Sequence, residues 1–229
     1  MHKGRFIGVG VGPGDPELMT LKAVKAIEDA DVLMLPSADK TSCRAYQTAY
    51  KACRGMDDKE CMFEPFPMKM DKEELELFHK MIAGKVESVL DEGKDVVFLT
   101  IGDTCVYSTY DYVERLVGDD GYETLRISGV PSFVAAAGRL DMSLGDNGRP
   151  IHIIPGNGNI EEALKLEGTK IFMKTGRNLD NIKGLLAEYE KSGGRIRGVY
   201  KCSMPEEKTA YCVDDIGDDW GYMNILIAD

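Results

Sequence analysis

Three short stretches of the sequence combine glycine with small polar or acidic residues, and each follows an apolar run. The first, GVGVGPGDP, has glycine at every second position from 8 to 14 and ends with Asp15 and Pro16. A glycine loop between a strand and a helix commonly binds phosphate through its backbone N–H groups. The dinucleotide fingerprint G-x-G-x-x-G fails here, because its third glycine falls on Pro13 or Asp15. Asp15 would also place negative charge beside a phosphate, so the stretch predicts a tight strand-to-helix turn.

The other two stretches add polar groups at comparable positions. FLTIGDTCVYSTYDYV places Gly102 and Asp103 after the clearest strand pattern of the chain, and ISGVPSFVAAAGRL places Gly129 and Ser132 after the next one. Open parallel sheets bind their ligands at the carboxyl ends of the strands. Loops of this composition suit a ligand that carries an amine, a carboxylate and a ribose but no phosphate. S-adenosylmethionine is such a ligand.

The elements that must position these loops alternate between strand and helix patterns. An amphipathic helix is predicted at residues 72–92, where apolar residues recur with the period of a helix. A continuous apolar run at 95–101 is typical of a buried parallel strand. Further strands are predicted at 6–11, 32–35 and 123–127, and further helices at 20–28, in the second half of 37–55, at 107–117 and at 132–140. This alternation predicts a parallel sheet wrapped by helices.

The composition changes at residues 141–150, DMSLGDNGRP, where turn-forming residues predict a linker. Beyond it, strands are predicted at 151–155, 170–174, 196–202, 209–213 and 224–228, and helices at 160–166 and 179–191. Several of these strands are joined by only a few residues, which favours antiparallel pairing. We therefore expect two α/β domains with a cleft between them. The N-terminal domain would span residues 1–140 with a mostly parallel sheet, and the C-terminal domain residues 151–229 with a mixed sheet.

Composition narrows the functional class. A net charge of −11 argues against a protein that binds nucleic acid by neutralising its phosphates. The chain has no apolar run of about eighteen residues, so no membrane span is expected, and MHKGR leads straight into a strand pattern without a signal peptide. Six cysteines without a CxxC pair and three scattered histidines predict neither a zinc site nor a disulfide framework. We expect a cytoplasmic protein with reduced thiols and no bound metal.

Four segments resemble the tetrapyrrole (corrin and porphyrin) methylases of cobalamin biosynthesis, and the similarity covers nearly the whole chain. They are GVGPGDPELMTLKA, GDTCVYST, SGVPSFVAAAGRL and IFMKTGRNL. Within this family the chain is most similar to the C20-methyltransferases that act on precorrin-2 or cobalt-factor II. That closer similarity rests on GDTCVYSTYDYV, on Phe-Pro-Met at 66–68 followed by Asp71 and Lys72, and on Cys-Ser-Met-Pro at 202–205.

The resemblance implies two α/β domains that hold S-adenosylmethionine between them, release S-adenosylhomocysteine and form a homodimer. It also implies cofactor contacts, mainly through backbone groups, by Pro13, Ile101, Gly102, Asp103, Val106, Pro131, Ser132, Met173 and Ser203. The sequence departs from the family pattern at Thr104, which replaces the proline usual after Gly-Asp. Pro36 stands where uroporphyrinogen-methylating relatives carry an acidic residue, which disfavours that activity.

Methyl transfer from a sulfonium requires alignment of donor and acceptor rather than a nucleophilic side chain. The acceptor would be an electron-rich meso carbon of the macrocycle, and Asp103, Tyr107 and Asp111 are candidates for the base that removes its surplus proton. For the tyrosines at 107, 110 and 112, packing is favoured over stacking on the macrocycle. The substrate carries several carboxylates, so basic residues are expected to bind it: Lys40, Arg44, Arg139, Lys174 and Arg177.

Alternatives remain at this point. The chain could be a relative that methylates a modified protein or ribosomal RNA, or a module that binds a nucleotide without catalysis. The sequence leaves metal-free precorrin-2 and cobalt-factor II open, although six free thiols are compatible with an anaerobe and favour the cobalt-bearing substrate. The helices predicted at 107–117 and 132–140 carry apolar residues on more than one face, which supports a dimer. Burial of both helices within the monomer is the alternative.

Overall fold

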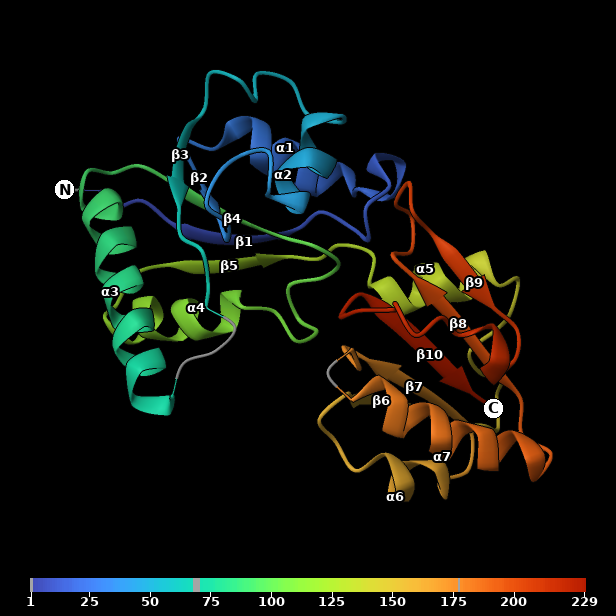
Figure 1. Ribbon diagram of the computed structural model, residues 1–229. Helices are drawn as coiled ribbons and strands as arrows, with labels where there is room; N and C mark the ends of the chain where they lie inside the picture. Colours follow the sequence, from blue (N-terminus) through green and yellow to red (C-terminus); the bar gives the residue numbers. More distant parts are fainter. Residues whose placement is uncertain (1, 68–70, 177) are drawn as a thin grey trace. The chain divides into compact units, whose positions relative to one another are not determined.

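A computed structural model describes residues 2–67, 71–176 and 178–229 (Figure 1). By its internal contacts the chain divides into two units, Met1–Pro131 and Ser132–Asp229, each with its own sheet. The predicted linker at 141–150 therefore lies inside the second unit. The reason is that helix α5 (Ser132–Arg139), which the sequence places before the linker, packs against two strands of the second unit.

The described residues of the first unit form a five-stranded parallel sheet with the order β3-β2-β4-β1-β5. Its strands are β1 (Phe6–Gly10), β2 (Val32–Leu35), β3 (Glu60–Phe63), β4 (Val96–Thr100) and β5 (Thr124–Ile127). This confirms the predicted parallel sheet. Gly10 pairs with Thr100 and Val9 with Ile127, so β1, β4 and β5 end almost level with one another. The loops that follow these three strands consequently start at the same edge.

Helices cover both faces of this sheet, because alternate strand residues point to opposite sides. Figure 1 shows α1 and α2 on one side and α3 and α4 on the other. Ile7 and Val9 face α1 and α2, whereas Phe6 and Phe98 face α3 and α4. The helices are α1 (Leu21–Asp29), α2 (Arg44–Tyr50), α3 (Lys72–Asp91) and α4 (Tyr110–Asp119). Burial on both faces explains why β1 and β4 read as continuous apolar runs.

Two local features differ from the sequence expectation. Strand β3 was not predicted, because Glu-Cys-Met-Phe is short, partly exposed and lacks an alternating pattern. It forms at the edge of the sheet by pairing with β2, which is a tertiary contact. Helix α4 starts at Tyr110 rather than at Tyr107, because Tyr107 has a backbone φ of 51° that a right-handed helix excludes.

The described residues of the second unit form a mixed five-stranded sheet with the order β6-β7-β10-β8-β9. Its strands are β6 (Ile151–Pro155), β7 (Thr169–Met173), β8 (Ile196–Tyr200), β9 (Lys208–Ala210) and β10 (Asn224–Ala228). Only β6 and β7 are parallel among these pairs, and the others are antiparallel, as predicted. Helices α6 (Ile160–Leu164) and α7 (Leu179–Lys191) pack on the sheet around Phe172, Leu226 and Trp220.

Within the described ranges, no helix combines the length and apolarity that a membrane crossing requires. The same residues contain no group of three or more His, Cys, Asp or Glu side chains arranged to hold a metal ion. The cysteines at 43, 53, 61, 105, 202 and 212 are all free. Burial raises the pKa of the Cys53 thiol to about 11, so this group stays protonated near neutrality.

The carboxyl group of Glu87 on α3 is a weak point of the first unit. Its Oε1 atom is buried and has no hydrogen-bond partner among the residues that the structure describes, and burial together with the nearby Asp120 carboxylate raises the pKa of Glu87. A raised carboxyl pKa means that ionisation costs more in the folded than in the unfolded chain. The folded state therefore loses stability as the pH rises through the unfolded pKa of about 4.3, and that loss is complete above the folded pKa.

Replacing Glu87 by glutamine is expected to raise the melting temperature at pH 7 by about 2–4 °C, since the uncharged amide removes this cost. The gain should shrink as the pH falls towards 4, where the wild-type carboxyl is protonated. Differential scanning calorimetry of both proteins between pH 4 and 8 measures it. Glu76→Gln on the exposed side of the same helix is the control, because its ion pair with Lys72 is solvated and weak. An equal gain in both variants, or none in Glu87→Gln, contradicts the prediction.

Candidate functional site

Three loops meet at the carboxyl edge of the first unit's sheet. They follow β1, β4 and β5, which are neighbours in the strand order. Gly12 in the first loop and Gly102 in the second exchange two backbone hydrogen bonds. The Gly12 N–H donates to the Gly102 carbonyl at 3.1 Å, and the Gly102 N–H donates to the Gly12 carbonyl at 2.7 Å. The loops after β1 and β4 are therefore paired with each other.

The third loop joins them through glycine-to-glycine packing. A Cβ atom on Gly129 would lie 2.2 Å from the carbonyl oxygen of Gly102 and 2.6 Å from that of Gly10. A Cβ on Gly10 would lie 2.6 Å from the Gly102 oxygen and 2.7 Å from the Gly129 nitrogen. Only glycine allows the three backbones to approach this closely. We call the cluster of Gly10, Gly12, Gly102 and Gly129 the glycine junction.

The rest of the first loop is a turn into helix α1, as predicted. Gly12 has a φ of +75°, a conformation that favours glycine. The Asp15 carboxylate accepts a hydrogen bond from the Glu17 N–H at 2.9 Å and so caps the short 3-10 helix Pro16–Leu18. Thr20 caps α1 by accepting from the Ala23 N–H at 3.1 Å. The glycines of this loop thus allow close packing and the acid caps a helix.

Asp103 lies in the second loop and is only 8% exposed. Its Oδ1 accepts a hydrogen bond from the Cys105 N–H at 2.7 Å, and its Oδ2 accepts one from the Gly129 N–H at 2.9 Å. Among the described residues it forms no ion pair with a Lys, Arg or His side chain. The carboxylate is therefore held by backbone N–H groups of two loops.

The remaining residues predicted to bind the cofactor in this unit also lie on these loops. Pro13 and Gly102 are buried, whereas Ile101, Val106 and Pro131 are half-buried. Ser132 begins α5 and belongs to the second unit. Residues 10–16, 101–107 and 128–132 contain two aspartates and no Lys, Arg or His. This set of side chains suits a ligand with positive charge and disfavours a phosphate.

The residues predicted as bases or aromatic contacts separate into two groups. Tyr107 is 41% exposed and keeps its left-handed backbone at φ 51°, a strain often found at functional sites. Asp111, in contrast, forms an ion pair with Arg126 at 2.5 Å. Tyr110 is fully buried, and Tyr112 stacks on His79 with ring centroids 4.8 Å apart. The expectation of packing is confirmed for Tyr110, whereas Tyr112 packs against His79 and stays 49% exposed.

The second unit places its predicted site residues at the ends of β7 and β8. Met173 is the last residue of β7 and is buried. Lys174 after β7, and Lys201 and Ser203 after β8, have φ values of 60°, 48° and 63°. Such values are uncommon for residues other than glycine and cost about 1–3 kcal/mol each. The strained backbone positions of the second unit therefore lie in the segments after β7 and β8, which contain the predicted site residues Lys174 and Ser203.

Glu207 is a site residue that sequence reasoning missed. Its carboxylate accepts from the Ser203 N–H at 2.7 Å and also forms a short ion pair with Arg139 on α5. Glu207 therefore links the predicted residues Arg139 and Ser203, although it lies outside the Cys-Ser-Met-Pro motif at 202–205. Hydrogen bonding to Glu207 raises the pKa of Arg139. No sequence signal distinguishes Glu207 from the adjacent Glu206.

The other basic residues predicted to bind substrate are placed separately. The Lys40 ammonium donates to the Asp57 carbonyl at 3.3 Å and lies 5.2 Å from the centre of the Tyr46 ring. Arg44 is the exposed first residue of α2. The Lys174 ammonium lies 5.4 Å from the Tyr222 ring. Arg177 lies outside the described residues.

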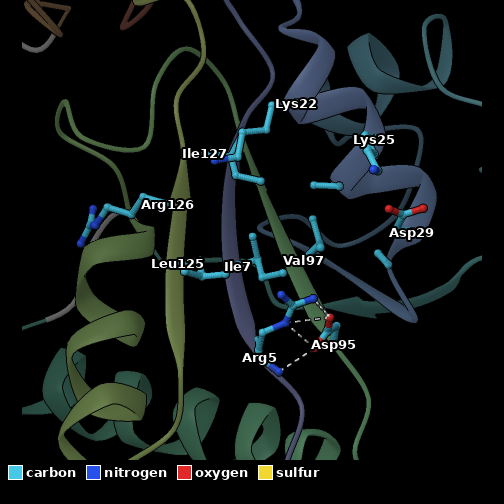
Figure 2. A pocket seen from close by; sticks show the side chains of 12 residues that line it. Arg5, Ile7, Lys22, Lys25, Asp29, Asp95, Val97, Leu125, Arg126 and Ile127 are labelled. Atoms are coloured by element: carbon cyan, nitrogen blue, oxygen red, sulfur yellow. Dashed lines mark hydrogen bonds and ion pairs between the residues drawn. The ribbon is translucent and has the colours of Figure 1, made fainter.

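A cavity of about 240 Å³ lies between α1 and the strands β1, β4 and β5 (Figure 2). Figure 2 shows Ile7, Val97, Leu125 and Ile127 on its sheet side and the Arg5–Asp95 ion pair at one end. Lys22, Lys25 and Asp29 from α1 complete the wall. None of the residues predicted for the site lines this cavity, so it is distinct from the glycine junction.

Comparison with known proteins identifies relatives that match most of the chain. A family model described as Tetrapyrrole (Corrin/Porphyrin) Methylases matches residues 5–213. A probable cobalt-precorrin-2 C(20)-methyltransferase of Methanocaldococcus jannaschii is 34% identical, over 77% of this chain and 74% of the relative. A precorrin-2 C(20)-methyltransferase of Sinorhizobium sp is 30% identical, over 98% of this chain and 94% of the relative.

Solved structures show the same fold. A cobalt precorrin-4 methyltransferase superposes with a TM-score of 0.75 at 21% identity, over 98% of this chain and 94% of that chain. A uroporphyrin-III C-methyltransferase of Thermus thermophilus in complex with S-adenosylhomocysteine gives a TM-score of 0.68 at 18% identity, over 98% and 97%. These similarities extend over both sheets of this chain and show a shared fold.

Proposed function

We propose that this chain, which belongs to the tetrapyrrole (corrin/porphyrin) methylase family, methylates carbon C20 of a precorrin-2-type macrocycle with S-adenosylmethionine. It is a methyltransferase by family, and its relatives carry the names of C20-methyltransferases. The observation that carries the proposal is the glycine junction with Asp103 beside it, because loops with acids and without basic side chains support a ligand that lacks phosphate.

The residues at this edge fit S-adenosylmethionine. Its loops contain acids and no basic side chain, which complements the positive sulfur and the amine of that cofactor. S-adenosylmethionine supplies a methyl group that its sulfonium already activates. Pro13, Ile101, Gly102, Val106 and Pro131 would hold it in the first unit, on loops that Asp103 positions, with Ser132, Met173 and Ser203 as proposed contacts from the second.

The chain's own contribution to the reaction is alignment and proton removal. Holding two reactants in the productive geometry lowers a barrier by about 7–11 kcal/mol in favourable cases, so no nucleophilic side chain is needed. Tyr107 is our candidate for the base at the acceptor carbon, because it lies on the loop after β4 and is 41% exposed. The Asp111 carboxylate, in contrast, forms an ion pair with Arg126. Asp103 already accepts two backbone hydrogen bonds, which makes it the weaker candidate.

The substrate carboxylates are expected to be bound by cationic side chains. Arg139 forms an ion pair with Glu207, which also accepts a hydrogen bond from the Ser203 N–H. We therefore expect the Arg139 guanidinium to stabilise the loop that contains Ser203 rather than to bind the substrate. Lys40, Arg44 and Lys174 remain proposed substrate contacts at exposed or half-buried positions. Bidentate carboxylate binding favours Arg44 among these three.

Incubation with S-adenosylmethionine and either cobalt-factor II or precorrin-2, followed by mass spectrometry, tests the function. We expect one added methyl group, and we expect faster turnover of the cobalt-bearing substrate, since the relative from Methanocaldococcus jannaschii is named for a cobalt-bearing substrate, cobalt-precorrin-2. Labelled methyl groups recovered in ribosomal RNA or protein instead of the macrocycle would refute the proposal. So would binding of NAD without binding of S-adenosylhomocysteine, because that is the behaviour of a nucleotide-binding module.

We also propose that the enzyme is a homodimer. Val134 on α5 and Tyr112 on α4 are 46% and 49% exposed, which leaves apolar surface on both helices. Symmetric dimers are the commonest oligomers of soluble proteins. Sedimentation equilibrium at micromolar concentration should give twice the mass of 25.3 kDa. A single-chain mass without concentration dependence would rule the dimer out.

The free thiols support a reducing compartment, and we place the enzyme in the cytoplasm on this basis. Burial raises the pKa of Cys43 and Cys202 as well as that of Cys53, so these thiols are structural rather than reactive.

A further inference from the structure

We propose that Asp103 is a positioning residue, whose carboxylate ties the loop after β4 to the loop after β5 and thereby shapes the cofactor site before the cofactor binds. The inference rests on the proposed function, because it concerns the same edge of the sheet. It assigns the effect of Asp103 on cofactor binding to the loops rather than to a direct contact.

The two oxygens of Asp103 have different tasks. The hydrogen bond from the Cys105 N–H to Oδ1 spans two residues and stabilises a local turn. The hydrogen bond from the Gly129 N–H to Oδ2 spans 26 residues and joins two loops that no strand pairing connects directly. β4 and β5 are separated by β1 in the sheet, so this bond reaches across the end of β1.

Steric contact and this hydrogen bond act in opposite directions on Gly129. The backbones of Gly10 and Gly102 already lie so close that the loop after β5 cannot move further inwards. It can only move away from the junction, and the bond to Asp103 opposes that movement. Together they fix one position for residues 128–131, which include the predicted cofactor contact Pro131.

We call the hydrogen bond from the Gly129 N–H to Asp103 Oδ2 the tie, and burial strengthens it. Asp103 is 8% exposed, and a charged acceptor in a site with little water forms a stronger hydrogen bond than a neutral one. A loop that is ordered in advance loses less conformational entropy when the ligand binds. Removing the tie should therefore weaken cofactor binding even where no cofactor atom touches the carboxylate.

Asparagine at position 103 separates the two bonds. Asp103→Asn leaves one side-chain oxygen, which can accept from only one of the two N–H groups. We expect it to keep the local turn with the Cys105 N–H, because asparagine favours this turn, so that the NH2 group faces the Gly129 N–H and two donors cannot pair. Asp103→Ala removes both bonds. The matched control is Asp119→Asn, which changes an exposed acid at the end of α4 in the same unit.

Two measurements test the tie. Amide hydrogen exchange of the free proteins should show faster exchange in Asp103→Asn at residues 128–130, and in Asp103→Ala also at 104–106. Calorimetry should show an S-adenosylhomocysteine Kd about tenfold weaker in Asp103→Asn than in wild type, and weaker still in Asp103→Ala. Saturating S-adenosylhomocysteine should restore slow exchange in the Asn variant. Asp119→Asn should match wild type in every measurement.

Other results would overturn the inference. A weaker Kd with wild-type exchange in the free loops would show that Asp103 acts by direct contact. An unchanged Kd in both variants would show that the tie does not matter for binding. Thermal unfolding of each variant confirms that exchange is compared between folded proteins. Failure of the wild-type chain to bind S-adenosylhomocysteine would refute the proposed function instead, and the exchange of the free loops would still decide whether the tie exists.

Discussion

Replacing Gly129 by alanine is expected to abolish S-adenosylhomocysteine binding and to destabilise the first unit by about 3 kcal/mol or more. The added Cβ would lie 2.2 Å from the Gly102 carbonyl oxygen and 2.6 Å from that of Gly10. Both neighbours are backbone atoms in paired segments, so they cannot rotate away as a side chain would. The loop after β5 must move outwards, and its hydrogen bond with Asp103 is lost. Calorimetric binding and thermal unfolding measure the two effects.

Gly84→Ala is the control for this prediction. Gly84 lies within α3 of the same unit. Apart from its chain neighbours and the adjacent helix backbone, no atom of the described residues lies within 4 Å of the position that its Cβ would occupy. Alanine in a helix interior is favoured over glycine by about 1 kcal/mol, so this variant should be slightly more stable and should bind normally. Normal binding by Gly129→Ala would show that the close approach at the glycine junction is not needed for the site.

Tyr110→Ala is expected to cost about 3–5 kcal/mol of unfolding free energy, the range for removal of a large buried aromatic side chain. The ring is fully buried, with its centroid 4.9 Å from that of Phe6 and 5.8 Å from that of Phe98. Its hydroxyl lies 2.9 Å from the carbonyl oxygens of both Phe6 and Leu125, which belong to β1 and β5. Tyr110 therefore supports two of the strands that carry the site loops. Denaturant unfolding at pH 7 measures the loss.

Two further variants divide the effect of Tyr110 into packing and hydrogen bonding. Tyr110→Phe keeps the ring and should cost about 1 kcal/mol, the contribution of one buried hydrogen bond. Tyr112→Phe changes a half-exposed tyrosine two residues further on, whose ring stacks on His79, and should be nearly neutral. A loss in Tyr110→Phe as large as that in Tyr110→Ala would mean that the hydroxyl, rather than the ring, supports the strands.

Several features of this protein are determined locally by its sequence. The buried strands β1 and β4 are continuous apolar runs, and the helix at 72–91 shows a clear helical period, so periodicity identifies both. The glycine spacing after β1 excludes a dinucleotide fingerprint without any knowledge of the fold. The alternation of these elements also predicts the parallel sheet, because a helical crossover returns the chain in the same direction. Motif resemblance then indicated the family.

The partners of the site residues were decided only by the tertiary structure. Asp103 and Gly129 lie 26 residues apart, and nothing in either motif shows that the acid accepts a hydrogen bond from the glycine. Glu207 likewise meets Arg139 across 68 residues. Strand β3 forms by pairing at an edge, and α5 joins the second unit by packing on β8 and β10. Each of these features depends on contacts between segments distant in the chain. A local pattern can specify the conformation of a segment, but the partner it meets is selected by how the whole unit packs.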